Sequence, residues 1–549
     1  MHTQQGAGVG GATIDRRAVL GVLGGLGSLA GGVAGGVAGL AGLAGCAWLP
    51  TPGAAGLPQR TPEEQGIDSA AIQAFVEAAA VQARELHGLL LCRHGHVVAQ
   101  GWSQPHGPQW AHPLYSLSKS FTATAVGFAV AEGRLSLQDR VVRLLPDAVP
   151  ARVGEHLAEL RVRDLLTMSA GQMHEPSPEA MREPDWARQI LAVPFVAAPG
   201  STFRYSSAAS YLCSAIVQRL TVQRLTHYLG PRLFEPLGIG PVRWETCPQG
   251  IDLGASGLYL PTHALARFGQ LLMQGGSWQG RQILPAGWVA EATSRQIQQA
   301  RPTGARVRPD WVQGYGYHFW RCTHDAYRGD GAFGQFLVVM PRQRAVLALQ
   351  GECEDMQATL DLVWSHLLPA MGDAPRAAAP AAHQRLLQAL GRLELERPAG
   401  QPGSARAAGL SGRSFALAPN ALGLESVSLA FESGLAHAVF RGEGRVHPLA
   451  ARFEAWHHGQ TALPGMPPRL SPAGAPPVGT RHPYAAAMAW EDDATMQWLL
   501  RFPESAHHDR LTFRFTGEAL ELSFMGSIAA MARQPVDGRG TLRGTMLSA

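Results

Sequence analysis

The spacing of apolar residues changes along this 549-residue chain, and the change divides it into two folded parts. Near both ends of the first part, two short apolar runs are separated by a turn, as in a β-hairpin. The four runs are 89–92 and 97–99, then 336–340 and 345–349. Between them the sequence is mostly helical, for example at 209–220 and 263–273. We therefore predict an α/β sandwich, in which an antiparallel sheet flanked by helices carries a helical insertion.

Beyond residue 411 the apolar residues alternate with polar ones, which is the pattern of half-buried strands. The alternating sets are Val427, Leu429 and Phe431; Met496, Trp498, Leu500 and Phe502; Leu511, Phe513 and Phe515; and Leu520, Leu522 and Phe524. We predict a small all-β domain, a barrel or a sandwich, over 411–549. The pairs His457-His458 and His507-His508 could be metal ligands, but we expect them on the solvated surface.

The other segments complete the predicted domain organisation. Residues 1–46 form an export signal, and residues 47–62 form a tether rich in Pro and Gly. The first globular domain covers 63–372, and 46% hydrophobic residues are ample for packed cores. Residues 373–410 are rich in Ala, Pro and Gly around one short helical stretch, and we predict a linker there.

The export prediction depends on two short patterns. Arg16-Arg17 precede a Gly-rich apolar span without a charged residue until Arg60, which resembles a twin-arginine signal. The apolar run ends at Leu43-Ala44-Gly45-Cys46, which resembles a bacterial lipobox whose cysteine becomes the lipidated N-terminus. An uncleaved membrane helix is the alternative, because the span is long enough to cross a bilayer. We expect an exported lipoprotein, periplasmic or at the cell surface, anchored in the membrane through Cys46.

Composition excludes several other classes. The net charge is only +4 and no basic run occurs, so we expect no nucleic-acid partner. The sequence has no Walker loop, no H-E-x-x-H helix and no Cys-x-x-Cys pair, and we expect neither a cofactor nor a metal. Five cysteines remain after Cys46, an odd number that implies no complete disulfide framework.

Lys119 is the only lysine, since every other one of the 46 Lys and Arg residues is an arginine. Arginine stays protonated, whereas a buried lysine can lose its proton and act as a base. Ser116 precedes it by three residues at the start of a helical pattern, which places hydroxyl and amine on one helix face. A serine at this spacing also occurs by chance. The uniqueness of the lysine favours a serine nucleophile activated by Lys119.

Tyr205 is the candidate for a second proton carrier. It lies in the loop 199–207, just before an apolar helix. Beside a protonated lysine, we expect its pKa to fall toward a useful range. An ordinary buried tyrosine with a satisfied hydroxyl is an equally good interpretation of Tyr205 alone.

Four ordered blocks resemble the serine β-lactamase/penicillin-binding-protein superfamily, in its class C β-lactamase-like and esterase-like branch. The blocks are Ser116–Lys119, Arg163–Gly171, Pro199–Ser207 and Tyr327–Gln335. The resemblance covers roughly residues 60–370, and the tail resembles lipocalin-like modules. It implies that Ser116 is the acylated nucleophile, Lys119 its activator and Tyr205 a proton shuttle. It also implies an oxyanion hole made by the backbone N–H groups of Ser116 and Ala332.

Two departures from the family pattern concern substrate binding. Ser207 replaces the asparagine of a Tyr-x-Asn motif, and Gly329-Asp330-Gly331 replaces a Lys-Thr-Gly or His-x-Gly triplet. In relatives that bind penicillins or D-Ala-D-Ala, this triplet helps to hold the substrate carboxylate. Asp330 would repel a carboxylate unless Arg328 turns inward. We therefore rank neutral or amine-bearing esters and amides above β-lactams.

The sequence thus predicts an exported serine hydrolase that acts on small esters or amides through an acyl-enzyme. One alternative is a D,D-carboxypeptidase or β-lactamase whose anion contact comes from Arg328. Another is a non-catalytic sensor or binding lipoprotein, although a site without turnover gives no reason to retain the lone lysine. A Ser-His-Asp α/β-hydrolase is disfavoured, because no serine lies in a complete G-x-S-x-G motif.

The export prediction can be checked by intact-mass analysis of membrane-extracted protein. The mature chain should begin at a diacylglyceryl-modified Cys46, and Cys46→Ala should remain at the mass of the unprocessed chain. A wild-type protein that retains residues 1–45 would contradict the prediction.

Overall fold

The computed structural model describes residues 56–82, 85–300, 308–470 and 476–548. The predicted export signal with Cys46, and most of the predicted tether, lie outside these residues. Within these described residues, no helix is both long enough and apolar enough to cross a membrane. The five cysteines of the described chain are buried thiols without disulfide partners.

Within the described residues, six strands of the first domain form one sheet in the order β2-β1-β11-β10-β9-β8. Their bounds are β1 Leu86–Arg93, β2 His96–Trp102, β8 Trp320–Arg321, β9 Tyr327–Gly331, β10 Gln335–Met340 and β11 Ala345–Gly351. Both predicted hairpins are confirmed, as β1–β2 and β10–β11. They form one sheet because β1 pairs antiparallel with β11, where Leu89 lies opposite Leu349.

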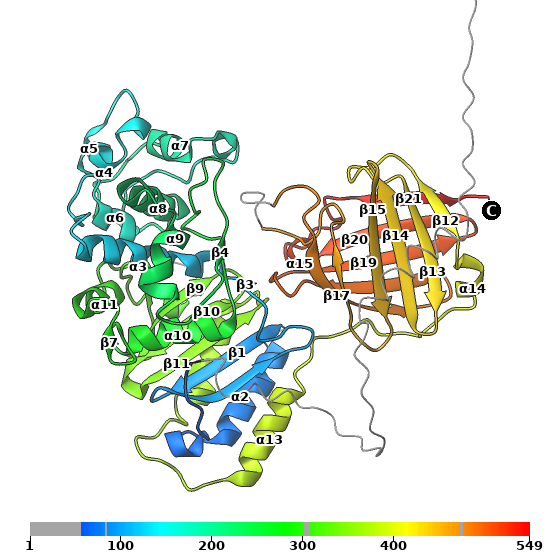
Figure 1. The fold of residues 1–549 in the computed structure, drawn as a ribbon, viewed down its shortest axis with the longest axis horizontal. Helices are drawn as coiled ribbons and strands as arrows, with labels where there is room; N and C mark the ends of the chain where they lie inside the picture. The colour runs from blue at the N-terminus through cyan, green and yellow to red at the C-terminus, as the bar shows by residue number, and fades with distance from the viewer. Residues whose placement is uncertain (1–55, 83–84, 301–307, 471–475, 549) are drawn as a thin grey trace, which may run out of the picture.

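The central strands are buried on both faces, because successive side chains point to opposite sides of a sheet. Leu89 and Leu91 of β1 belong to the core under α2 (Ser69–Gln82), whereas Leu90 belongs to the core under α10 (Thr262–Met273). Figure 1 shows the resulting layers, with α2 on one side of the sheet and α10 on the other. The predicted α/β sandwich is confirmed.

The insertion between β2 and β8 supplies most of the described helices and five short strands. Its helices are α3 Ser118–Ala131, α4 Val141–Leu144, α5 Glu155–Glu159, α6 Val162–Leu166, α7 Trp186–Ala192, α8 Ser207–Thr221, α9 Leu225–Leu229 and α11 Ala286–Thr293, besides α10. Its short strands include β3 His112–Pro113, β4 Arg243–Trp244, β5 Leu258–Leu260, β6 Ser277–Trp278 and β7 Arg281–Gln282. The helices predicted at 209–220 and 263–273 are present as α8 and α10.

The sequence predicts a linker at 373–410, but part of this segment belongs to the first domain. Helix α13 (Pro380–Gly391) packs against α2, and α12 (Met356–Leu362) lies on the same side of the sheet. Leu386 and Leu390 of α13 are buried in the core that also holds Phe75 of α2. The sequence around α13 is rich in Ala, Pro and Gly, so the two buried leucines did not stand out as a core-facing side of a helix.

The second domain is a closed β-barrel with one further strand, which pairs with a barrel strand but lies outside the closed ring. Its strands are β12 Ser414–Leu417, β13 Ser426–Glu432, β14 Leu435–Gly442, β15 Arg445–Arg452, β16 His457–Thr461, β17 His482–Trp490, β18 Thr495–Arg501, β19 His508–Thr516, β20 Ala519–Gly526 and β21 Thr541–Met546. Two short helices, α14 (Ala407–Leu410) and α15 (Ser527–Met531), accompany them. In the described residues the barrel strands lie in the order β15-β14-β13-β12-β21-β20-β19-β18-β17, and β16 pairs with β17 outside the ring. A β15–β17 pairing closes the ring.

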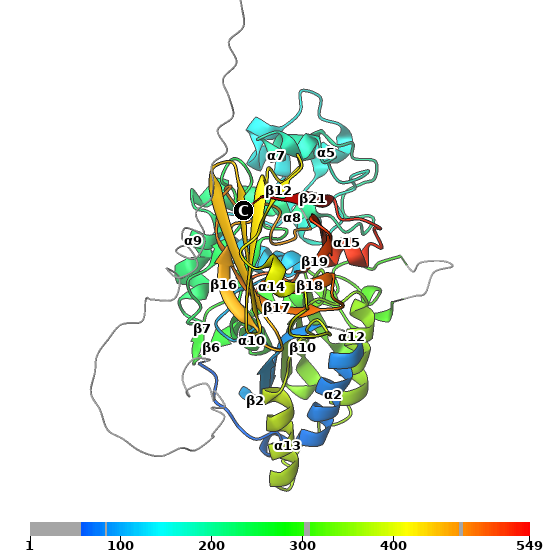
Figure 2. The same cartoon turned by 90° about the vertical axis from the view of Figure 1, so that its right-hand side faces the viewer.

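The barrel interior contains the side chains that the alternating pattern predicts to be buried. The inward rows of β18, β19 and β20, including Trp498, Phe513 and Leu522, form one hydrophobic core. The expected small all-β domain is confirmed. Figures 1 and 2 place this barrel beside the first domain, next to the insertion and one end of the six-stranded sheet.

The packing of α13 gives a matched pair of variants. Leu386 is fully buried, whereas the adjacent Leu387 is 45% exposed. Leu386→Ala should lower the free energy of unfolding of the first domain by about 2–5 kcal/mol, because it leaves a cavity. Leu387→Ala should change it by about 0.5 kcal/mol or less. Urea unfolding of the full chain measures both, and equal losses in the two variants would contradict the assignment of α13 to this core.

Candidate active site

Ser116 lies at the entrance of the buried helix α3. It occupies a short 3-10 turn, Tyr115–Leu117, that runs directly into α3, so the turn and the helix are nearly continuous. The serine keeps part of its surface accessible, whereas Leu117 and nearly every residue of α3 are buried. This arrangement presents one hydroxyl at the end of a rigid element.

The Lys119 amine points back along the helix to this hydroxyl. Lys119 Nζ lies 3.1 Å from Ser116 Oγ and 3.4 Å from Ser207 Oγ, and it donates a 2.9 Å hydrogen bond to the Ala255 carbonyl. Only 1% of its surface is exposed. Burial lowers the pKa of Lys119 to about 7, although Glu175 and Asp330 act in the opposite direction. A substantial fraction of this lysine is therefore neutral near neutral pH and can accept a proton from Ser116.

Two hydrogen bonds from α3 fix the segment that carries the Ala255 carbonyl. Thr122 Oγ1 donates to the Gly254 carbonyl at 2.8 Å, and the Leu258 N–H donates to Ser118 Oγ at 3.2 Å. Gly254 has a φ of +66°, and a Cβ there would lie only 2.7 Å from Ser214 Cβ. The acceptor of the Lys119 amine is thus held by the same helix that carries the amine.

Tyr205 covers the other side of the amine. Lys119 Nζ lies 4.9 Å from the centroid of the Tyr205 ring, and the ring stacks on Trp320 at 5.5 Å. Burial and then the charge of Asp330 raise the pKa of Tyr205, although the Ser116 hydroxyl acts against them. The expectation of a lowered pKa is therefore wrong, because desolvation is the largest effect, and the Tyr205 hydroxyl stays protonated.

The block 163–171 supports the loop that carries Tyr205. The Arg204 N–H donates to the Met168 carbonyl at 2.7 Å, and the Gly200 N–H donates to the Ser169 carbonyl at 2.8 Å. Gly171 approaches the Ala197 carbonyl so closely that a Cβ would lie 2.1 Å from its oxygen. The blocks 163–171 and 199–207, which are separate in the sequence, therefore pack together and hold the loop that carries Tyr205.

Glu175 joins this site from a loop without a recognisable motif. Its carboxylate accepts the N–H groups of Ser207 and Ala208 at 3.0 and 3.1 Å, at the first turn of α8. Negative charge at a helix N-terminus is favourable. Glu175 is exposed, and it raises the pKa of Lys119. It therefore places a negative charge next to the site.

Arg328 and Asp330 of β9 form a buried pair. Arg328 Nε donates to Asp330 Oδ2 at 2.9 Å, and their exposed fractions are 0% and 7%. The Arg328 guanidinium also lies 4.2 Å from the centroid of the Trp311 ring. Arg328 has turned inward, so its charge offsets the repulsion that an isolated Asp330 would exert on a substrate carboxylate.

The two glycines beside Asp330 bring β9 against the nucleophile. A Cβ on Gly329 would lie 2.6 Å from Ser120 Oγ, and one on Gly331 would lie 2.0 Å from the Leu114 carbonyl oxygen. These contacts place the end of β9, and Ala332 after it, next to the turn that carries Ser116. Gly329 and Gly331 are therefore needed for the close packing of β9 against α3 and Leu114. They do not provide a side-chain contact to a substrate.

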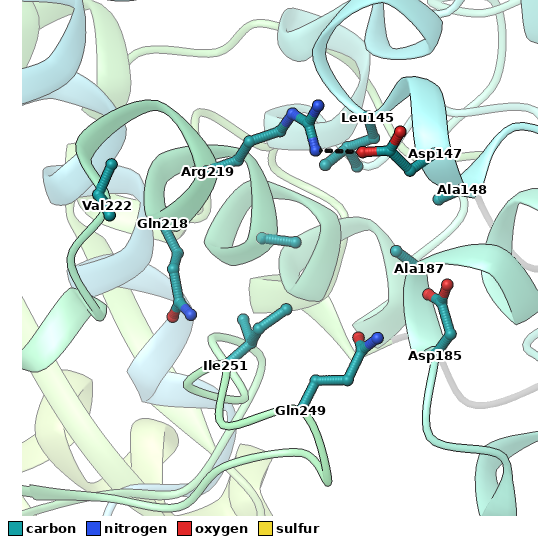
Figure 3. Close-up of a pocket in the computed structure, with 11 residues that line it drawn as sticks. Leu145, Asp147, Ala148, Asp185, Ala187, Gln218, Arg219, Val222, Gln249 and Ile251 are labelled. Atoms are coloured by element: carbon teal, nitrogen blue, oxygen red, sulfur yellow. Dashed lines mark hydrogen bonds and ion pairs between the residues drawn. The ribbon is translucent and has the colours of Figure 1, made fainter.

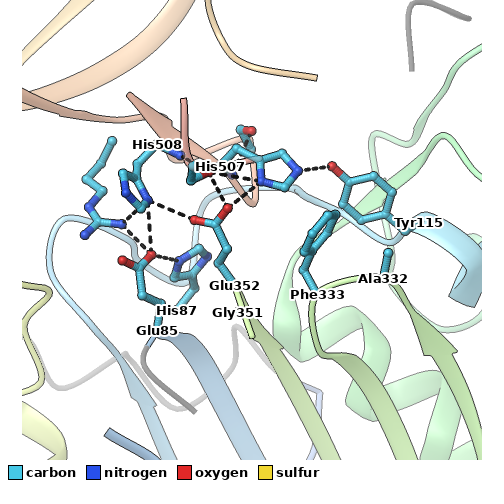
Figure 4. Close-up of polar contacts among 12 residues, drawn as sticks. Glu85, His87, Tyr115, Ala332, Phe333, Gly351, Glu352, His507 and His508 are labelled. Carbon is cyan, nitrogen blue, oxygen red and sulfur yellow. Dashed lines mark hydrogen bonds and ion pairs between the residues drawn. The ribbon is translucent and has the colours of Figure 1, made fainter. Parts of the chain in front are cut away.

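His507 and His508 differ from their expected position on the solvated surface. Both lie in the interface between the barrel and the first domain, where they contact Glu352, and His508 also contacts Glu85 (Figure 4). Ligand atoms of Glu85, Glu352 and His508 lie within 4.8 Å of one another, as in a metal site. Arg501 donates to Glu85 and lies 2.9 Å from His508 Nδ1, so this arginine already supplies the cation of the cluster.

A cavity of about 420 Å³ lies elsewhere in the insertion (Figure 3). It is lined around the last turns of α8, and Arg219 and Asp147 form a 2.7 Å ion pair beside it. Arg219 follows Ser207 by twelve residues on the same helix, which corresponds to about 18 Å. This cavity is therefore separate from the Ser116–Lys119 site.

The structure thus brings Ser116, Lys119, Tyr205 and Ser207 together, as the sequence predicts. Glu175 and the Ala255 carbonyl are site components that the sequence reasoning missed. A backbone carbonyl leaves no trace in the side-chain sequence, and Glu175 stands in a loop without regular spacing. The four ordered blocks are the part of the sequence that indicates site residues, and neither Glu175 nor Ala255 lies in them.

Comparisons with known proteins place the chain in a family. The family model described as beta-lactamase matches residues 69–352, just over half of the chain. The chain is similar to the 6-aminohexanoate-dimer hydrolase of Paenarthrobacter ureafaciens, with 26% identity over 277 residues, 47% of this chain and 70% of that protein. It is also similar to esterase EstB of Burkholderia gladioli, with 28% identity over 208 residues, 32% of this chain and about half (53%) of that protein. A penicillin-binding protein homolog from Caulobacter crescentus aligns with a TM-score of 0.45 at 18% identity, over 55% of this chain and 97% of that chain.

The pKa of Lys119 predicts a pH dependence. If neutral Lys119 is the base, kcat/KM for a p-nitrophenyl ester should fall about tenfold per pH unit below about pH 7 and level off above pH 8. Lys119→Arg keeps the charge but cannot lose the proton, and it should lower the plateau by about 10²–10⁴-fold. A wild-type rate that stays constant from pH 5 to 8, or a Lys119→Arg rate within a few-fold of wild type, would contradict this role.

Proposed function

Because the chain belongs to the beta-lactamase family, whose matched relatives include an esterase and a 6-aminohexanoate-dimer hydrolase, we propose that it hydrolyses small esters or amides through an acyl-enzyme on Ser116. The observation that carries the proposal is the 3.1 Å contact between Ser116 Oγ and a buried lysine with a pKa of about 7. A lysine that served only as a structural cation would gain nothing from such desolvation.

In the proposed acylation, Ser116 Oγ attacks the substrate carbonyl while Lys119 Nζ takes its proton. The backbone N–H groups of Ser116 and Ala332 stabilise the oxyanion that forms. Tyr205, which stays protonated, donates a proton to the leaving group and recovers one by way of Lys119. A water molecule then releases the acyl group along the reverse proton path.

Charge at the site favours neutral or cationic substrates over anionic ones. Arg328 neutralises Asp330, so the negative charge that remains accessible is that of Glu175. A substrate amine close to Glu175 would be attracted, and a substrate carboxylate would be repelled. The preference against carboxylates therefore rests on Glu175 rather than on Asp330.

A D,D-carboxypeptidase or β-lactamase would require a cation for the substrate carboxylate. Arg328 is fully buried and paired with Asp330. Its use for a substrate would leave Asp330 buried without a partner, which is costly. A non-catalytic binding role is disfavoured by the lowered pKa of Lys119. We further propose that the enzyme is exported and lipid-anchored at Cys46, a proposal that rests on the sequence patterns around Arg16-Arg17 and Leu43–Cys46 alone.

Three p-nitrophenyl esters of matched length test the function and its charge preference together. They are the neutral hexanoate, the cationic 6-aminohexanoate and the anionic adipate half-ester. At pH 8.5, where Lys119 is neutral, we expect the adipate ester to react about fivefold more slowly than hexanoate. A like charge about 8 Å away costs about 1 kcal/mol at an effective dielectric of about 40. The 6-aminohexanoate ester should react at least as fast as hexanoate.

Glu175→Gln is the matched variant, because it removes the charge and keeps an acceptor for the first turn of α8. It should bring the three rates together. Ser116→Ala should abolish turnover of all three esters, and its failure to do so would contradict the acyl-enzyme. Efficient hydrolysis of nitrocefin, or an unchanged charge preference in Glu175→Gln, would contradict the proposed substrate class.

A further inference from the structure

His507 of the barrel contacts both sides of the proposed oxyanion hole. Its Nε2 lies 2.6 Å from the hydroxyl of Tyr115, the residue before Ser116. Its ring also meets the ring of Phe333, the residue after Ala332, edge-on with 4.6 Å between centroids. Figure 4 shows the imidazole directed at these two side chains from the loop that precedes β19.

Tyr115 and Phe333 share an unusual backbone conformation. Their φ angles are +46° and +65°, in the left-handed region that side-chain-bearing residues rarely adopt. Such conformations persist only where the surroundings enforce them, and they concentrate at functional sites. Tyr115 orients the peptide that carries the Ser116 N–H, and Phe333 orients the peptide that follows Ala332, one peptide away from the Ala332 N–H. Contacts that hold the two aromatic side chains therefore also hold the oxyanion hole.

The imidazole is itself fixed by the first domain. His507 Nδ1 lies 2.5 Å from Glu352 Oε1, and the Ser527 hydroxyl donates to the same oxygen. A carboxylate can only accept, so His507 Nδ1 donates to Glu352, and Nε2 faces the Tyr115 hydroxyl. His507 is only 2% exposed and Glu352 only 5%. The chain Glu352–His507–Tyr115 thus links a buried carboxylate and a buried imidazole to the half-buried Tyr115.

We propose that His507 is a positioning residue of the hydrolase, through which the barrel completes the active site by holding Tyr115 and Phe333 around the oxyanion hole. The inference rests on the proposed function. It assigns the second domain a role in turnover, beyond attachment. His507 does not touch the substrate; it acts through the backbone at Tyr115, next to the Ser116 N–H, and at Phe333, which follows Ala332.

The test uses the full chain and two variants that break the same contact from opposite domains. Tyr115→Phe removes only the hydroxyl, and His507→Ala removes the imidazole. A small displacement of reacting groups can cost about 100-fold in rate. We therefore expect kcat for p-nitrophenyl hexanoate to fall about 10- to 100-fold in each variant, with KM within about threefold of wild type. The double variant should be little worse than His507→Ala, because the hydroxyl–imidazole contact is shared.

A second readout separates positioning from a general loss of folding. A boronic acid that forms a tetrahedral adduct with Ser116 should bind more weakly by about the same factor as kcat falls, since the adduct oxygen occupies the oxyanion hole. His507→Gln, which retains a hydrogen-bonding group, should recover part of the loss. His458→Gln changes an exposed residue of β16 in the same barrel and should match wild type in both measurements.

The possible results are distinguishable. Values of kcat within threefold of wild type in Tyr115→Phe and His507→Ala would overturn the inference while leaving the proposed function intact. A change in KM alone, with boronate affinity unchanged, would also overturn it. If His507→Ala does not fold, the kcat and boronate affinity of Tyr115→Phe decide. A wild-type protein without Ser116-dependent turnover would overturn the proposed function, and this inference with it.

Discussion

Burial of the Lys119 amine is the constraint on which the site depends. Lowering its pKa from 10.5 to about 7 corresponds to about 5 kcal/mol against the protonated form. Unfolded lysine binds a proton below about pH 10.5 and the folded one only below about pH 7, so stability rises with pH between these values. The cost is complete below about pH 7 and disappears above about pH 10.5. The rest of the domain must offset this cost, and arginine in its place could not be neutralised at all.

The surrounding architecture follows from the need to exclude water from one short stretch of helix. α3 lies in the core on nearly every side, the segment at 254–258 is hydrogen-bonded to it, and β9 closes against its first turn. Gly329 and Gly331 permit that closure because any side chain would collide with α3 or with Leu114. Charges that cannot be excluded are paired, as in Arg328–Asp330, whereas Glu175 remains at the accessible edge.

Much of this could be predicted where a regular spacing carries the information. The hairpins, α8, α10 and the alternating barrel strands follow from periodicity, and Ser116 and Lys119 follow from one helical turn and a unique residue. The remainder depends on contacts between segments remote in sequence. The pKa of Tyr205 moves opposite to expectation because local charge is the smaller effect once the ring is enclosed by Trp320 and Tyr315. His507 belongs to a domain whose docking face has no periodic signature.

The docking face explains how the barrel is held in one position against the first domain. β1 and β11 are neighbours in the sheet, so Glu85 and Glu352 lie together at its end. Burial opposes both charges, but Arg501 and His508 keep the pKa of Glu85 well below its usual range, and His507 and His508 lower that of Glu352. Buried charges contribute little net stability, yet each is satisfied in only one relative position of the domains. A slid or rotated barrel would remove the contacts of Arg501, His507 and His508 with these two carboxylates. The same interaction that fixes the barrel therefore also brings His507 to Tyr115.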